Sequence, residues 1–171
     1  MNPRSTIWIA LTLCLAACDD GDGGEASPAL PSAATPEAIL AFIESRRFEG
    51  PGWRVETPAP REESTPVSPH DRVQVFQNEA LVQTRASNDY APDSMAVKAL
   101  YDAEGGAEPE GFAAMWLEPG ASAFTYFCYG PRGRCGLAEQ APTPEEPVFG
   151  RGSAVVCGQC HGGMIFTQIE P

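Results

Sequence analysis

Two cysteines and a histidine lie close together near the end of the 171-residue chain, in the segment "CGQCH" from Cys157 to His161. Cysteines three positions apart on a helical turn lie on one side, so both sulfurs can form thioethers to the two vinyl groups of one porphyrin. The next residue, His161, then directs its imidazole at the iron. The motif therefore predicts one covalently attached haem c, held by Cys157 and Cys160, with His161 as the proximal iron ligand.

Other uses of these cysteines stay open at this point. A zinc site would recruit Cys128 and Cys135 to make four thiolates, but their separation of seven positions is not a zinc knuckle and leaves His161 without a role. A redox site of the thioredoxin kind needs its first cysteine at the start of a helix in a βαβ unit, and no such pattern surrounds Cys157. A simple disulfide-bonded turn also ignores His161.

The other cysteine pair encloses the segment "YGPRGR". Its Gly-Pro and Arg-Gly steps can turn the chain back on itself. We therefore expect a disulfide between Cys128 and Cys135 that closes a hairpin. Such a bond persists if the chain is exported to an oxidising compartment.

The first residues have the features of an export signal. Arg4 precedes the apolar run from Ile7 to Ala17, which is too short to span a bilayer. The run ends in small residues before Cys18, which resembles the lipobox of bacterial lipoproteins. We expect residues 1–17 to be a removed signal peptide and Cys18 to be lipidated. The protein would then be an exported lipoprotein, anchored to a membrane by lipid and facing the periplasm or the cell exterior.

Composition sets two further limits on organisation and partners. Residues 19–35 contain acids, Gly, Ser, Pro and Ala but few large apolar side chains, so residues 18–35 read as a lipidated flexible tether before one domain at 36–171. The formal net charge is −12, which disfavours nucleic acid and anionic lipid surfaces as partners.

The domain has the pattern of an α+β protein with a small antiparallel sheet, flanking helices and a C-terminal haem-attachment segment. Thr35 and Pro36 predict the start of a helix that ends at about Phe48, and Asn78 is a candidate N-cap for a short second helix. A further short helix from Ser153 could carry the two closely spaced cysteines. Short runs with β character, separated by Gly- and Pro-rich turns, start at Trp53, Arg72, Met95, Phe112 and Ser122.

Lys98 is the only lysine among eleven basic residues and lies inside "SMAVKALYD". With period-two alternation it shares a face with Ala96 and Leu100, so neither face is polar around it. One interpretation is a lysine at the edge of the sheet whose ammonium reaches water. The other is a lysine desolvated beside the haem, where its neutral amine is nucleophilic.

Several segments taken together resemble the cytochrome P-460 family, to which cytochrome c′-beta belongs. The resemblance covers about Trp53 to Pro171 and is most specific at the haem motif and the lysine strand. It is carried by "DRVQVFQN", "MAVKALYD", "AFTYFCYGP" and "CGQCHGGMIFTQIEP".

This resemblance implies a small antiparallel β fold with helices, commonly a homodimer, with one c-type haem near the C-terminus. Lys98 falls on the lysine that forms a covalent bond to the porphyrin in P-460 enzymes, which oxidise hydroxylamine. By this resemblance the chain oxidises hydroxylamine or a related small nitrogen compound and passes electrons to a soluble acceptor. The alternative within the same family is a non-catalytic binder of nitric oxide, like cytochrome c′-beta.

A third function, electron transfer, needs a sixth ligand that keeps small molecules off the iron. The nominal ligands are Met95, Met115, Met164 and His70, although His70 lies in a proline-flanked segment where we expect it to be exposed. An open iron would instead be covered by apolar side chains. The candidates for lining that face are Phe76, Phe124, Tyr126 and Phe127.

Overall fold

The computed structural model describes residues 29–62, 70–87, 89–137 and 139–161. The expected signal peptide and the lipidation site at Cys18 lie outside these residues, and so does Met164. In the described parts of the chain, no helix has the length and apolar character needed to cross a membrane.

A seven-stranded antiparallel sheet forms the centre of the protein, which is therefore an α+β fold. The strands lie in the order β1-β3-β4-β5-β6-β7, and β2 also pairs with β3. Their bounds are β1 Trp53–Val55, β2 Arg61–Glu62, β3 Arg72–Asn78, β4 Met95–Tyr101, β5 Gly111–Trp116, β6 Thr125–Tyr129 and β7 Val148–Arg151. The helices are α1 Pro36–Glu44, α2 Glu79–Thr84 and α3 Val156–His161, with short 3-10 turns η1 Arg47–Glu49, η2 Arg85–Ser87 and η3 Gly152–Ala154.

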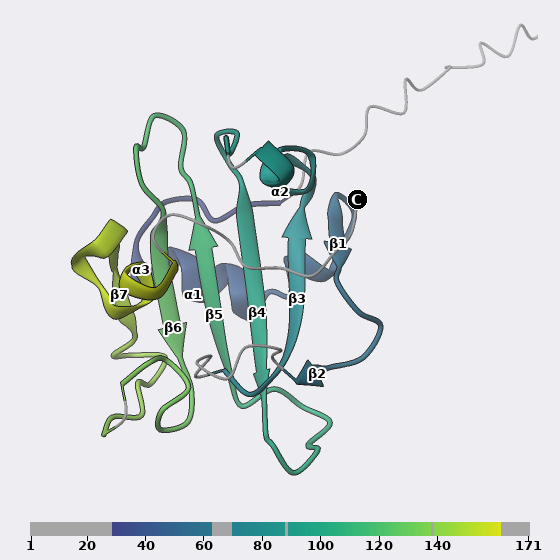
Figure 1. Ribbon diagram of the computed structural model, residues 1–171, viewed down its shortest axis with the longest axis vertical. Coiled ribbons are helices and arrows are strands. Elements are labelled where there is room, and N and C mark those ends of the chain that lie inside the picture. The colour runs from purple at the N-terminus through teal and green to yellow at the C-terminus, as the bar shows by residue number, and fades with distance from the viewer. Residues whose placement is uncertain (1–28, 63–69, 88, 138, 162–171) are drawn as a thin grey trace, which may run out of the picture.

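One face of the sheet packs against α1, which Figure 1 shows behind the strands. The side chains of Met95, Val97, Ala99 and Tyr101 in β4 join the same apolar cluster as residues from α1 and η1. Burial of large apolar side chains supplies the main stabilisation of such a core. These residues are Ile39, Phe42 and Ile43 of α1 and Phe48 of η1.

The opposite face of the sheet lies toward α3, which Figure 1 shows in front of the strands. Val73, Val75 and Leu100 form one buried cluster on this face, and Met115, Phe124 and Tyr126 form another. Because strand residues alternate between faces, these residues and the α1-facing residues come from the same strands. We call this second side the α3 face.

The ends of the predicted elements needed correction at several points. The first helix stops at Glu44 and not at Phe48, because Ser45 caps it and Arg46 takes a left-handed backbone conformation with φ of 54°. Phe48 is buried within the separate turn η1. The strand expected from Ser122 begins at Thr125, and the strands β2 and β7 were not expected at all.

The buried side chain of Asn78 joins three elements at the end of β3. Its Oδ1 accepts hydrogen bonds from the backbone N–H of Leu81 at 3.1 Å and of Met95 at 3.0 Å. Its Nδ2 donates to the backbone carbonyl of Asp93 at 2.6 Å. The first contact caps α2, as the sequence predicted, and the other two fix the start of β4.

Replacement of Asn78 by alanine should therefore destabilise the fold strongly. We expect the free energy of unfolding to fall by roughly 2–4 kcal/mol, because a helix cap is lost and the N–H of Met95 is left buried without an acceptor. Urea unfolding followed by circular dichroism measures this change. Thr35→Ala is the matched control, since Thr35 caps α1 at an exposed site and should cost about 1 kcal/mol or less. Equal losses in the two variants would contradict the joining role of Asn78.

Candidate functional site

Lys98 lies in the interior of the α3 face and not at an edge of the sheet. Its strand β4 is hydrogen-bonded on both sides, and the residues directly opposite Lys98 are Val75 on β3 and Ala113 on β5. Along β4 its same-face neighbours are Ala96 and Leu100, as the alternation predicted. The expectation of a lysine at the sheet edge is therefore wrong. Two of the four surrounding side chains are alanines, so a flat group could approach this part of the sheet closely.

The helix α3 carries the whole motif from Cys157 to His161. Gly158 is buried within it, and a Cβ atom at this position would collide with the carbonyl of Gly152 in η3. A glycine is therefore required for α3 to pack against the preceding turn. The side chain of Cys157 is half-buried and packs against both apolar clusters of the α3 face.

His161 ends α3 and lies beside an aromatic residue of the sheet. Its ring centroid is 6.2 Å from that of Tyr126, with an angle of 32° between the ring planes. Tyr126 is only 1% exposed, and His161 is half-buried. The sheet thus places one ring of the α3 face next to the imidazole that the sequence assigns to iron.

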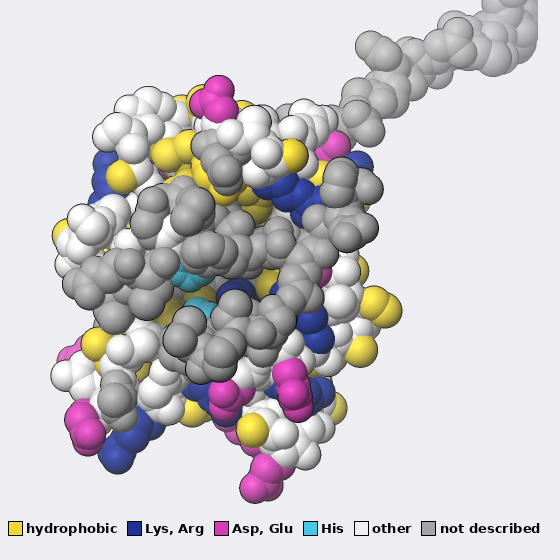
Figure 2. All heavy atoms as spheres, in the orientation of Figure 1, with side chains coloured by type: hydrophobic (Ala, Val, Ile, Leu, Met, Phe, Trp, Pro, Cys, Tyr) yellow, Lys and Arg dark blue, Asp and Glu magenta, His cyan; other side chains and the backbone are white. Residues whose placement is uncertain are grey.

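His70 is buried, and its expected exposure is wrong. Its side chain is 9% exposed although the chain around it is rich in proline. The pKa of His70 is lowered from 6.5 to about 3, chiefly by burial and to a smaller extent by the nearby charges of Lys98 and His161. The structure thus brings His70, Lys98 and His161 together. Figure 2 shows histidine side chains and a basic side chain close to one another near the middle of this face.

The position of His70 depends on Arg134, which sequence reasoning missed. The side chain of His70 is hydrogen-bonded to the backbone of Arg134, and this bond opposes the lowering of the pKa. The guanidinium of Arg134 forms an ion pair with Asp71, whose backbone is left-handed with φ of 51°. No local pattern around Arg134 marks this contact, because its partners lie far away in the chain.

A disulfide joins Cys128 of β6 to Cys135, the residue that follows Arg134. The two Cα atoms are 5.8 Å apart, and the enclosed loop is the hairpin that the sequence predicted. This covalent link excludes the four-thiolate zinc site, because neither cysteine is a thiolate. Every strand pair among the described residues is antiparallel, so these residues contain no βαβ redox unit around α3.

The two faces of the sheet divide the remaining candidate residues. Met95 is fully buried in the α1 cluster and therefore cannot act as a ligand on the α3 face. Phe76 and Phe127 belong to the same α1 cluster. Met115, Phe124 and Tyr126 do lie in the cluster that contacts Cys157. Half of the aromatic residues proposed to line an open iron site are thus on the wrong side.

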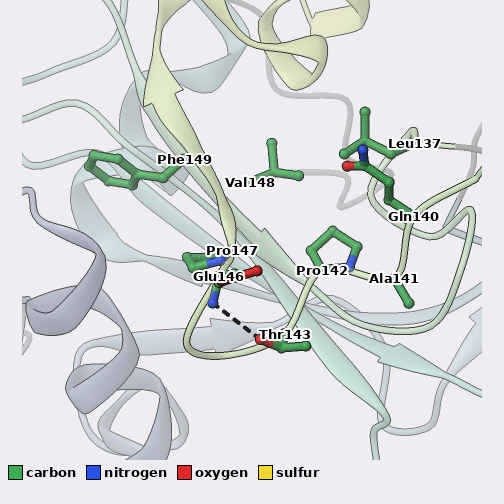
Figure 3. Close-up of a pocket in the computed structure, with 9 residues that line it drawn as sticks. All are labelled: Leu137, Gln140, Ala141, Pro142, Thr143, Glu146, Pro147, Val148 and Phe149. Atoms are coloured by element: carbon green, nitrogen blue, oxygen red, sulfur yellow. Dashed lines mark hydrogen bonds between the residues drawn. The ribbon is translucent and has the colours of Figure 1, made fainter.

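A separate cavity of about 570 Å³ lies beside β7, outside the group formed by His70, Lys98 and His161. Figure 3 shows Pro142 and Pro147 on the loop and Val148 on the strand around it. Glu146 is its only charged residue, so this cavity offers no acid–base pair. The full lining is Leu137, Gln140, Ala141, Pro142, Thr143, Glu146, Pro147, Val148 and Phe149.

Comparison of the chain with protein-family models, with curated proteins and with solved structures gave no match. The function therefore has to be argued from the α3 face itself.

Neutral His70 should make the stability of the protein depend on pH. Between pH 6.5 and about 3 the unfolded chain binds a proton at His70 and the folded chain does not, so the free energy of unfolding falls as the pH falls. One such group contributes about 1.4 kcal/mol per pH unit, or about 2 kcal/mol between pH 6.5 and 5. Urea unfolding at pH 7, 6 and 5 should show this loss in wild type and a smaller loss in His70→Gln. Parallel pH profiles would show that His70 is charged in the fold.

Proposed function

We propose that this protein is a mono-haem c-type cytochrome of the P-460 type, exported and anchored to a membrane through lipid on Cys18. Cys157 and Cys160 would hold the haem through thioethers, and His161 would bind the iron. The proposed activity is the oxidation of hydroxylamine or a related small nitrogen compound, with electrons passed to a soluble acceptor. The observation that carries the proposal is that α3 places Cys157 and His161 of the motif against the sheet face where Lys98 lies.

The described residues fit such a group in four respects. The side chain of Cys157 contacts the clusters on either side of Lys98, so a porphyrin bound there would lie along the sheet. The short side chains of Ala96 and Ala113 leave room beside Lys98 for a flat group to approach the sheet. His161 is half-buried and its ring lies beside that of Tyr126, which limits its orientation. The disulfide of the other cysteine pair leaves Cys157 and Cys160 for the haem.

When bound, the haem supplies a redox-active iron, and the protein controls access, orientation and charge around it. Met115, Phe124 and Tyr126 form a buried apolar cluster next to Cys157 that would exclude water. His70 has a pKa of about 3, which is too low for an efficient general base near pH 7. We therefore do not assign His70 the role of proton acceptor. Lys98 remains the residue that distinguishes an enzyme from a gas binder.

A second candidate function, electron transfer, is favoured by one observation. His70 is buried and lies close enough to His161 for a charge on His161 to lower its pKa, and a neutral imidazole is the form that binds iron. If His70 were the sixth ligand, small molecules would be kept off the iron. A low-spin spectrum of the resting protein that becomes high-spin in His70→Ala would establish this carrier.

The first test is covalent haem attachment. We expect residues from Ala29 onward, which include the cap of α1, to keep the mass of one haem after denaturation when they are produced with a haem-maturation system. The double variant Cys157→Ala/Cys160→Ala should lose it, because both thioether bonds are removed. A denatured wild-type protein without haem mass, or with bound zinc, would overturn the proposal.

The second test concerns Lys98. A bond between its Nζ and a porphyrin carbon replaces one N–H and one C–H, so two electrons and two protons leave to an oxidant such as a peroxide. We expect the ferrous Soret band of wild type to be strongly red-shifted, and Lys98→Arg to lose this shift because it keeps the charge but lacks the amine. Protease digestion should then leave the Lys98 peptide attached to the haem peptide only in wild type. An ordinary five-coordinate haem c spectrum in both proteins would favour the nitric oxide binder.

A further inference from the structure

Two polar side chains form a hydrogen-bonded pair at the end of β3. Nη1 of Arg85 donates to Oε1 of Gln77 at 3.0 Å. Gln77 is fully buried in β3, and Arg85 is the half-buried residue that follows α2. Asn78 caps α2 directly after Gln77, so the cap also determines where Arg85 lies.

Each member of the pair has a hydrogen-bond donor left over. Nε2 of Gln77 and Nη2 of Arg85 are buried, and neither has a hydrogen-bond partner among the residues that the structure describes. The orientation of the amide follows from its neighbour, because Oε1 is the only part of the group that can accept from a guanidinium. Buried donors of this kind are rare in native proteins and require an explanation.

The charge of Arg85 is also uncompensated within the described residues. The ion pairs among them involve other arginines, namely Arg46, Arg54, Arg61, Arg134 and Arg151. A guanidinium stays charged at any ordinary pH, and burying it without an anion is costly. Although the chain has a net charge of −12, no carboxylate among the described residues forms an ion pair with Arg85.

The pair lies on the α3 face. Gln77 alternates with Val73 and Val75, which belong to the cluster that contacts Cys157. Val75 is directly opposite Lys98, so Gln77 is the diagonal neighbour of Lys98, at a typical distance of about 7–8 Å. The row that starts at Gln77 continues through Ala96, Met115 and Tyr126 toward His161.

We infer that Gln77 and Arg85 form a carboxylate-binding site on the α3 face, and that its ligand is a propionate of the haem. This assignment rests on the proposed function. Two adjacent N–H donors, one of them charged, match the two oxygens of a carboxylate better than they match a neutral acceptor. A porphyrin attached at Cys157 would lie against the row of residues that runs from Tyr126 through Met115 and Ala96 to Gln77, so this pair would be within reach of its edge. A free small carboxylate has the same chemistry and is the other source to be distinguished.

The test is the midpoint potential of the haem iron in the intact holoprotein as a function of pH. Arg85→Gln leaves the propionate charge uncompensated, which stabilises ferric iron, so the potential should fall. The pKa of the propionate should rise at the same time, so a pH dependence should appear near neutrality. Arg54→Gln is the matched control, because Arg54 is an exposed arginine paired with Glu79 at the other end of α2. Its potential should stay close to that of wild type.

Two further variants keep the test sharp if Arg85→Gln folds poorly. Arg85→Lys should recover part of the lost potential, because lysine keeps the positive charge but lacks the two adjacent N–H donors of the guanidinium. Gln77→Met removes the second donor without a change in charge, and we expect a smaller shift in the same direction. A residue that only supports the fold would change the melting temperature of these variants without a pH-dependent change in potential.

The remaining outcomes separate the possible failures. If acetate shifts the potential of wild type but not that of Arg85→Gln, the pair binds a free carboxylate and the propionate assignment is wrong. If Arg85→Gln and Arg54→Gln have equal potentials with and without acetate, the site does not exist. Absence of haem mass in wild type overturns the proposed function, and the propionate assignment with it.

Discussion

The register of β4 between β3 and β5 determines which residues face α1 and which face α3. Met95, Val97 and Ala99 are buried in the α1 cluster. Because side chains alternate along a strand, Lys98 must then lie on the α3 face. A shift by one residue would place a charged amine in the most apolar part of the protein and expose the core set. The free-energy cost of such a shift keeps Lys98 on the α3 face, even without strong contacts of its own there.

The second constraint is the disulfide loop. It holds Arg134 beside Asp71 and His70, so a residue that precedes β3 is positioned by a loop that follows β6. The α3 face therefore receives residues from both ends of the sheet. Three of its basic groups, His70, Lys98 and His161, come from a turn, a central strand and the last described helix, and only the fold brings them together.

Much of this fold was predictable from local patterns. The strand at Met95 to Tyr101, the capping role of Asn78 and the faces of β4 follow from alternation and cap chemistry, which act over a few residues. The strand β7 was not predictable, because Gly150 interrupts a short run that is stable only when paired with β6. The burial of His70 was missed for the same reason, since it depends on Arg134. The pair of Gln77 and Arg85 also leaves no local signal, although its members are close in sequence.

The single layer of the sheet has a consequence for how such a protein can change over generations. Every residue of the central strands serves one side only, and α1 completes the apolar core without help from α3. A substitution at Lys98, which is only half-buried, should thus cost the fold less than one in the opposite set, which is held by volume and shape. A scaffold of this kind can exchange one chemistry for another through few mutations, with its architecture unchanged.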